Sequence, residues 1–351
     1  YSPNGAGPSG TVVRLPESGR QPRKASTGLR RIGCIGAGVH ALSSLYPHLS
    51  ALPADLAAVA TATGLSAQSV AKKYGFSYCT TDYREILSDP AIDAVLIATR
   101  NDLHASLAAE ALRAGKDVFV EKPLATSIEE LKEVVSAWNE SGQRLMVGFN
   151  RRYSPLARRM KEFFSNRTTP AVLHYRVNAG QIPSGHWVHD GEQGGGMLIS
   201  ECCHFIDFMQ YITGARPVQV YARAIEPTGD LPKYDNFQAT LAFDDGSVGT
   251  VTYTTLGDRS YPKEMIEVFC GNAVGRITDF RDLELRRDGK ASRERRWLTQ
   301  EKGFFEELLA FVKGEEPDFP ASVATTLATF AAWDSIDTGT PRTIDLGRVG
   351  L

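Results

Sequence analysis

Two groups of residues in this sequence have the types and the spacing for acid–base chemistry. The first is Glu121-Lys122-Pro123, which directly follows the apolar run Val118–Val120. Such a run predicts a buried parallel strand, and the charged pair and proline mark its carboxyl end, where open parallel sheets bind ligands. Lys122 is therefore placed for proton transfer beside a carboxylate. A solvated strand end is the alternative interpretation of the same residues.

The second group lies on a predicted helix, Met197–Ile212, that follows the glycine triplet Gly194–Gly196. Ser200 and Glu201 precede His204 by four and three residues, so helical geometry places all three on one face. We interpret His204 as an acid–base partner and Glu201 as the group that orients it. A helix histidine satisfied by its neighbours is the alternative.

The same region holds side chains that can bind metals, and we weighed a metal site against the acid–base interpretation. Cys202 and Cys203 are adjacent, so they point to different helix faces, and no ligand spacing is of a standard kind. We predict no metal and interpret these cysteines as small buried residues. The side chains considered as ligands were His186, His189, Cys202, Cys203 and His204.

A glycine turn near the start of the chain predicts a dinucleotide site. A short apolar strand from Arg30 runs into Gly36 and Gly38, and a helical pattern follows through Ala41–Leu49. This spacing lets backbone N–H groups approach a pyrophosphate at a helix N-terminus, while Ala41 fills the third small position. The predicted cofactor contacts in the turn are Gly36, Ala37, Gly38, Val39 and His40.

The second predicted strand, Leu56–Ala60, leaves the choice between NAD and NADP open. A dinucleotide fold usually has an acid at this point to hold the ribose hydroxyls. Thr61 and Thr63 stand there instead, and no arginine is adjacent to attract a 2′-phosphate. Both threonines are candidate contacts on the ribose side.

Strands and helices alternate over residues 31–148, which predicts a doubly wound parallel sheet, a Rossmann α/β fold. The strand Ala94–Ala98 ends in Thr99, Asn101 and His104, at the same carboxyl edge as Glu121. We expect these side chains, together with Glu121 and Lys122, to contact a cofactor. His104 equally suits a cap of the next helix.

Beyond residue 151 the pattern changes to successive strands, which predicts an α+β domain with a large, mainly antiparallel sheet. Such a sheet offers a broad surface for homo-oligomerisation. The predicted strands are Ala171–Val177, Val218–Ile225, Asn236–Phe243, Ser247–Thr255, Glu264–Cys270 and Val274–Asp279. We predict a linker or tail over 1–28, a dinucleotide domain over 29–150, a substrate and oligomerisation domain over 151–320, and a C-terminal helix and tail over 321–351 that packs near the first domain.

Composition narrows the class of protein. With 351 residues, 42% of them hydrophobic, the chain can form two cores. A formal charge of −2 gives no electrostatic reason to expect nucleic acid or a membrane surface, and no apolar run is long enough to span a bilayer. Five cysteines without a C-x-x-C pair suggest neither disulfides nor structural zinc, so we predict a cytoplasmic protein.

From residue 30 onwards the chain resembles the glucose–fructose oxidoreductase / inositol dehydrogenase family (Gfo/Idh/MocA). The combination of the Glu-Lys-Pro segment with a distant glycine triplet and histidine is the specific part of this resemblance. The matching segments are Gly33–Ala41, Asp82-Tyr83, Glu121–Ala125, Val147–Tyr153, Gly194–Gly196 and His204–Asp207.

The resemblance implies an NAD- or NADP-dependent oxidoreductase that acts on a sugar, a sugar derivative or a cyclitol, with Lys122 as acid/base and His204 assisting. It implies substrate contacts at Arg152, Tyr153, His186, Trp187 and His204. The family pattern has an Asp where this chain has Ser200, and Glu201 lies about 100° further around the helix. This departure weakens any transfer of substrate preference.

Two segments, Gly148–Tyr153 and His186–Gly196, look most like one subgroup of that family. In it, this module follows a domain similar to a medium-chain alcohol dehydrogenase. The resemblance therefore implies such a preceding domain, which fits a chain that opens on Tyr1 and a Gly/Pro/Ser-rich stretch.

Two rival functions remain open at this stage. One is a non-catalytic sensor or scaffold that binds nucleotide on the same fold. The other is redox-assisted elimination or glycoside cleavage, in which hydride is borrowed from the substrate and returned to it.

Overall fold

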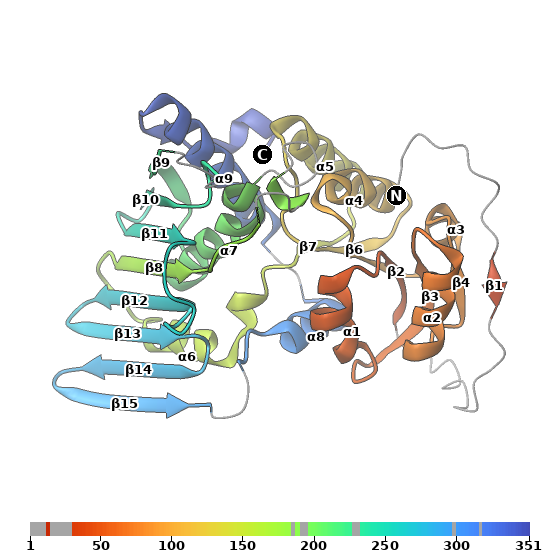
Figure 1. Cartoon of the computed structure of the whole chain (residues 1–351), viewed down its shortest axis with the longest axis horizontal. Helices are drawn as coiled ribbons and strands as arrows, with labels where there is room; N and C mark the ends of the chain where they lie inside the picture. The colour runs from red at the N-terminus through yellow and green to blue at the C-terminus, as the bar shows by residue number, and fades with distance from the viewer. Residues whose placement is uncertain are drawn as a thin grey trace. The chain divides into compact units, whose positions relative to one another are not determined.

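The computed structural model describes residues 12–14, 30–183, 187–189, 196–226, 232–296, 300–315 and 318–351. Its elements are labelled in Figure 1. The chain forms two compact units. The first contains the described parts of Tyr1–Leu124, Lys132–Gly148 and Phe305–Pro317, and the second those of Ala125–Leu131, Phe149–Phe304 and Asp318–Leu351.

The first unit is built on a seven-stranded sheet of order β1-β4-β3-β2-β5-β6-β7, parallel except for β1. This order is the doubly wound arrangement of dinucleotide-binding folds, with its switch point between β2 and β5. The strands are β1 Val13–Arg14, β2 Arg30–Ile35, β3 Ala54–Ala60, β4 Tyr78–Thr80, β5 Ala94–Ile97, β6 Asp117–Val120 and β7 Leu145–Val147.

The register of this sheet brings five strand ends into line. Ile35 of β2 pairs with Ala60 of β3 and Ile97 of β5, and Val120 of β6 pairs with Ile97 and with Val147 of β7. The residue that follows each strand therefore lies at one carboxyl edge. Those residues are Gly36, Thr61, Ala98, Glu121 and Gly148.

Helices that follow the strands complete the first unit. Helix α2 begins where the Thr63 hydroxyl accepts a hydrogen bond from the Ser66 N–H, and it ends at Gly75 in the left-handed conformation. Helix α8 packs on β6 through Phe311, whose ring centroid lies 5.7 Å from that of Phe119. The helices are η1 Ala41–Leu45, α1 Tyr46–Leu49, α2 Gly64–Tyr74, α3 Arg84–Ser88, η2 Asn101–Leu103, α4 His104–Arg113, α5 Ile128–Ser141, which continues into the second unit, and α8 Phe304–Lys313.

One short segment of the expected tail is ordered as a strand. Val13 and Arg14 pair antiparallel with Cys79 and Tyr78, so β1 covers the edge of β4. An unpaired strand edge can bind a further extended chain, and β1 occupies that position here. Apart from Val12, the other residues of the 1–28 segment lie outside the described residues.

The second unit contains a nine-stranded sheet of order β15-β14-β13-β12-β8-β11-β10-β9-β16. Neighbouring strands are antiparallel except β8 and β11. The strands are β8 Val172–Asn178, β9 Pro217–Ala224, β10 Phe237–Phe243, β11 Val248–Thr254, β12 Glu264–Cys270, β13 Ala273–Thr278, β14 Asp282–Arg287, β15 Lys290–Arg295 and β16 Arg342–Thr343.

Helices cover one face of this sheet, as Figure 1 shows. Helix α7 contacts β11 and α9, while α9 contacts β9 and α6 contacts β14. Alternate residues of the strands are buried against them, as in Phe237–Phe243. The helices are η3 Asn150–Tyr153, α6 Pro155–Phe163, η4 Trp187–His189, α7 Gly196–Thr213, α9 Phe319–Thr338 and η5 Leu346–Val349.

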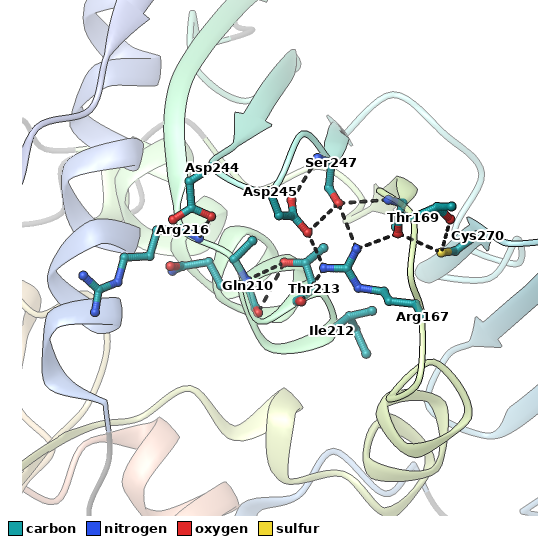
Figure 2. A network of polar contacts seen from close by, with 12 residues as sticks. Arg167, Thr169, Gln210, Ile212, Thr213, Arg216, Asp244, Asp245, Ser247 and Cys270 are labelled. Atoms are coloured by element: carbon teal, nitrogen blue, oxygen red, sulfur yellow. Dashed lines mark hydrogen bonds and ion pairs between the residues drawn. The ribbon is translucent and has the colours of Figure 1, made fainter.

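Arg167 connects the end of α7 to the β10–β11 hairpin, as Figure 2 shows. Its guanidinium donates to the carbonyl of Thr213 at 2.6 Å and forms an ion pair with Asp245. Asp245 in turn accepts from the N–H and the hydroxyl of Ser247, at 2.9 and 3.0 Å. This network fixes the carboxyl end of α7 to the sheet, which holds the helix that carries His204.

The predicted fold class is confirmed: a Rossmann-type parallel sheet is followed by a mainly antiparallel sheet. Helix α9, within the expected C-terminal segment, belongs to the second unit, because it packs on α7 and β9. The sequence interpretation missed the hairpin of β14 and β15, although Asp288-Gly289 is a hairpin-turn pair at its tip. Within the described residues, no helix is both long and apolar enough to cross a membrane.

Candidate active site

The glycine turn after β2 lies against the end of β5. Gly36 has a φ of +93°, and a Cβ built on it would lie 2.4 Å from the Ala98 carbonyl oxygen. Only glycine fits this position without moving backbone. The Tyr46 hydroxyl donates to the Gly36 carbonyl at 2.5 Å, which holds the turn from the other side.

Gly38, two residues further on, faces open space. A Cβ at Gly38 would meet no heavy atom within 4 Å, and the neighbouring Val39 side chain is 86% exposed. The backbone N–H groups at the start of η1 therefore border an unfilled edge, while Ala41 is buried against the sheet. A bare backbone edge of this kind fits a dinucleotide pyrophosphate.

The two threonines after β3 differ in their surroundings. Thr61 is buried, and its hydroxyl donates to the Thr63 carbonyl at 2.9 Å. Thr63 is exposed, and its hydroxyl caps α2. The acid that usually follows this strand is replaced by an internally bonded hydroxyl, so ribose contacts from Thr61 and Thr63 stay predictions.

Glu121 and Lys122 stand directly after β6. The Glu121 side chain is 6% exposed, and its Oε1 lies 3.4 Å from Nε2 of His40, which comes from the glycine turn. Oε2 accepts from the N–H of Lys122 at 3.2 Å. Burial opposes ionisation of Glu121, but His40 and Lys122 outweigh it, so the pKa of the carboxyl is lowered.

Gly148 makes room for this carboxylate, and the sequence interpretation did not assign it that role. A Cβ at Gly148 would lie 3.1 Å from Oε1 and 3.2 Å from Oε2 of Glu121. The signal was present in the sequence, because Gly148 is the last residue of the predicted strand Leu145–Gly148, whose end lies at the same sheet edge.

His104 contacts the backbone of the Lys122–Pro123 segment. It is the first residue of α4 rather than its cap, and its ring is 1% exposed. Nδ1 lies 2.8 Å from the Pro123 carbonyl oxygen, and the Lys122–Pro123 peptide is cis. Burial lowers the pKa of His104 against the opposing effect of that carbonyl, which favours a neutral ring that donates to Pro123. Thr99 and Asn101 lie on the preceding turn, half-buried and buried respectively.

In the second unit, α7 places Ser200 and His204 on its buried side. They are each 5% exposed, and the His204 ring meets Phe149 edge-on, with centroids 6.2 Å apart. Glu201 is half-buried, and its negative charge contributes to the raised pKa of two side chains, Arg151 and Tyr253. The helix that carries it, α7, contacts both η3 and β11.

The segment before α6 is held by ion pairs. Arg152 pairs with Asp207 on α7 through two guanidinium nitrogens, Nη2 and Nε, with Nε 2.9 Å from Oδ2. Arg151 donates to Glu264 at 2.8 Å. Because Asp207 lies one turn beyond His204, the Arg152 pair fixes the helix that carries the histidine. Contacts of Arg152 and of the half-buried Tyr153 with substrate stay predictions.

Two of the predicted substrate contacts are not among the described side chains. His186 and the side chain of Trp187 lie outside the described residues. Among the residues that the structure does describe, no group of three His, Cys, Asp or Glu side chains is arranged to hold a metal ion. All five cysteines are buried, and none of them forms a disulfide bond in the described part of the chain.

A doubly wound sheet with a glycine turn at its switch point, bare at Gly38, defines a dinucleotide-binding protein. Comparison with known proteins identifies the family. Residues 30–149 match the oxidoreductase family with an NAD-binding Rossmann fold, GFO_IDH_MocA, and residues 158–274 match the GFO/IDH/MocA C-terminal domain.

Individual relatives agree with this match. The oxidoreductase YrbE of Bacillus subtilis is 30% identical over 248 residues, which are 68% of this chain and 70% of that protein. Inositol 2-dehydrogenase of Rhizobium meliloti is 29% identical over 67% of this chain and 72% of that protein. A solved structure of levoglucosan dehydrogenase with NADH and levoglucosan shares the fold, with a TM-score of 0.77 at 23% identity over 90% of this chain and 99% of that one.

This chain belongs to the Gfo/Idh/MocA family, as the sequence resemblance implied. It is an oxidoreductase with an NAD-binding Rossmann domain.

Proposed function

We propose that this protein interconverts a carbinol and a carbonyl on a sugar, a sugar derivative or a cyclitol, with NAD or NADP as cofactor. The observation that carries the proposal is the position of Lys122 at the carboxyl edge of the parallel sheet, beside the buried Glu121 carboxylate and the glycine turn. The inositol dehydrogenase among its relatives supports the polyhydroxylated class of substrate.

In this mechanism a bound nicotinamide dinucleotide supplies the acceptor for the hydride that leaves the carbinol carbon. Lys122, in its neutral form, takes the hydroxyl proton at Nζ as the C–O bond becomes a carbonyl, and returns it in the reverse direction. Glu121 and His104 hold the backbone on either side of Lys122. We propose that His204 assists the proton transfer and that Glu201 orients His204.

The test replaces Lys122 with Ala and compares it with Lys132→Ala, an exposed lysine on α5. Calorimetric titration with NADH and with NADPH first identifies the cofactor. Oxidation of myo-inositol, D-xylose and levoglucosan is then followed by formation of reduced cofactor. We expect Lys122→Ala still to bind the cofactor but to lose about 100-fold or more in turnover, the usual contribution of a general acid/base. Lys132→Ala should match the wild type.

The rival functions predict other results. A nucleotide-binding sensor would bind NADH yet oxidise no polyol, with Lys122→Ala indistinguishable from wild type. Redox-assisted elimination or glycoside cleavage would consume substrate without net formation of reduced cofactor. Either result would replace the dehydrogenase proposal.

We further propose a homo-oligomer that forms through the open face of the second sheet. Val172 of β8 pairs with Val248 of β11 and Phe269 of β12, so three apolar side chains form a continuous row across that face. They are 59%, 41% and 43% exposed. A row of exposed apolar side chains on a sheet is typical of an interface.

Two further proposals concern the cellular location of the protein and a domain that precedes this chain. We propose a cytoplasmic location, which the buried free thiols support. We also propose a preceding domain similar to a medium-chain alcohol dehydrogenase. A gene whose reading frame starts at or just before Tyr1 would refute that domain.

A further inference from the structure

His189 and Asp235 form a buried pair in the second unit that the proposed mechanism does not use. His189 is the last residue of η4, and Asp235 lies in the turn before β10, where its N–H donates to the Pro232 carbonyl. The side chains are 9% and 2% exposed, and Nδ1 of His189 lies 3.7 Å from Oδ1 of Asp235. That separation is too long for a hydrogen bond and fits an ion pair bridged by a third group.

Two polar atoms of this pair are buried without a hydrogen-bond partner in the described part of the chain, Oδ1 of Asp235 and Nε2 of His189. A buried carboxylate oxygen without a donor is costly, and such atoms in native proteins are normally satisfied by water or by a ligand. Burial raises the pKa of Asp235 and the nearby His189 opposes that rise, as expected for a carboxylate short of donors.

The pair adjoins residues of the proposed active site. Tyr253 of β11 is buried, and its pKa is raised by burial and then by the negative charges of Glu201 and Asp235. Tyr253 pairs with Phe237, which lies two residues beyond Asp235, and α7, which carries Glu201, contacts β11. The Tyr253 ring stacks on Phe237 with centroids 5.3 Å apart and an interplanar angle of 6°. Aromatic rings beside hydrogen-bonding groups are typical of sites that bind ring-shaped polyols.

We propose that His189 and Asp235 form a subsite that binds a hydroxyl group of a neutral polyol substrate. A hydroxyl oxygen about 2.8 Å from each of the two atoms spans the 3.7 Å gap. It donates to Oδ1 of Asp235 and accepts from Nδ1–H of His189, and a second polar group of the ligand meets Nε2. The carboxylates of Asp235 and Glu201 repel anions, so the subsite selects an uncharged polyol over its phosphate ester or a sugar acid.

This inference rests on the proposed function, because it names the substrate class of the same site. The test therefore measures binding rather than turnover. Thermal unfolding of the full chain with NADH is recorded with and without myo-inositol, D-xylose, levoglucosan or myo-inositol monophosphate. The variants are Asp235→Asn and His189→Gln, which keep side-chain size. Asp337→Asn is the matched control, since it breaks the contacts of the adjacent Lys233 and Tyr234 but not the pair.

We expect at least one neutral polyol to raise the unfolding temperature of wild type and of Asp337→Asn, and the monophosphate to have no effect. Asp235→Asn and His189→Gln should bind that polyol about tenfold or more weakly, the usual effect of losing a hydrogen bond to a charged group. NADH affinity should stay equal in all four proteins, which shows that each variant is folded.

Equal stabilisation of wild type and both pair variants would overturn the subsite. So would stabilisation of wild type by none of the polyols, or by the monophosphate alone. If Asp235→Asn fails to bind NADH, His189→Gln decides alone. Polyol binding without any hydride transfer would refute the proposed function and leave the subsite standing, so the two failures are distinguishable.

Discussion

The two glycines of the cofactor turn offer a prediction that separates folding from binding. Gly36 is enclosed, because an added Cβ would lie 2.4 Å from the Ala98 carbonyl oxygen and 2.9 Å from Cγ2 of Thr99, at a φ of +93°. Gly38 is open, with no heavy atom within 4 Å of an added Cβ. The same change, Gly to Ala, should therefore have opposite consequences at the two positions.

The magnitudes follow from these geometries. Gly36→Ala adds about 1–2 kcal/mol for a left-handed alanine and about 1–3 kcal/mol for overpacking against backbone. The sum, roughly 2–5 kcal/mol, corresponds to a fall of about 5–20 °C in Tm. Gly38→Ala costs nothing in the free protein and even restricts the unfolded chain, so its Tm should stay the same or rise slightly. Its methyl group instead occupies the edge where a pyrophosphate must approach the backbone, which should weaken NADH binding about tenfold or more.

Differential scanning calorimetry of both variants and NADH titration of Gly38→Ala test this reasoning. Gly38→Ala is the informative protein, because it should be as stable as wild type yet poor at binding the cofactor. Unchanged NADH affinity in a stable Gly38→Ala would show that the dinucleotide does not lie on this turn. A Gly36→Ala protein as stable as wild type would refute the packing argument.

The remaining predictions concern the second unit. Burial opposes the charge of Glu264, but Arg151 and Lys302 outweigh it and hold the pKa of the carboxyl below its ordinary value of 4.5. Because the pKa of Glu264 is lower in the folded state, its charge stabilises the fold fully above pH 4.5, and this stabilisation is lost as the pH falls below that value. Glu264→Gln should therefore lower the free energy of unfolding by about 3–5 kcal/mol at neutral pH. The variant should also show a flatter dependence of that free energy on pH on the acid side. An unchanged acid limb would contradict the assignment. Val172→Arg should shift the sedimentation coefficient toward that of a monomer. Leu65→Arg, an equally drastic change at an exposed site of the first unit, should leave the sedimentation coefficient unchanged. A wild-type protein that sediments as a monomer would refute the proposed interface.

The parts of the fold that were predictable are those where burial leaves a pattern in the sequence. The central parallel strands are short apolar runs with turn residues at their ends, because both of their faces are covered. Strand β15 leaves no such pattern, since five of its six residues are exposed and its sequence is mostly charged. It forms because β14 presents a free edge, and that is a tertiary effect. The two-residue strand β1 was missed for the same reason.

In the candidate site, residue positions could be predicted from the sequence, whereas the contacts between side chains could not. The carboxyl edge of the sheet and the position of Glu121 and Lys122 on it could be derived from strand ends. That His104 would donate to Pro123, or that Arg152 would pair with Asp207, could not, because these contacts depend on side-chain directions across separate elements. His189 and Asp235 are 46 residues apart and belong to no motif, so only the folded chain brings them together.

The replacement of the family's aspartate by Ser200 can be related to the carboxylates of the second unit. The resemblance places an aspartate at that position, but the serine here is buried, and the carboxylate follows one residue later on Glu201. A shift of about 100° around α7 moves the negative charge toward Arg151 and Tyr253. Glu201 and Asp235 both act on the pKa of Tyr253, after its burial. Ionised carboxylates accept hydrogen bonds and do not donate them, so the proposed subsite should bind hydroxyl groups in preference to anions. Proton transfer is the role proposed for Lys122 and His204. On the same proposal, substrate preference depends on Glu201, Asp235 and His189.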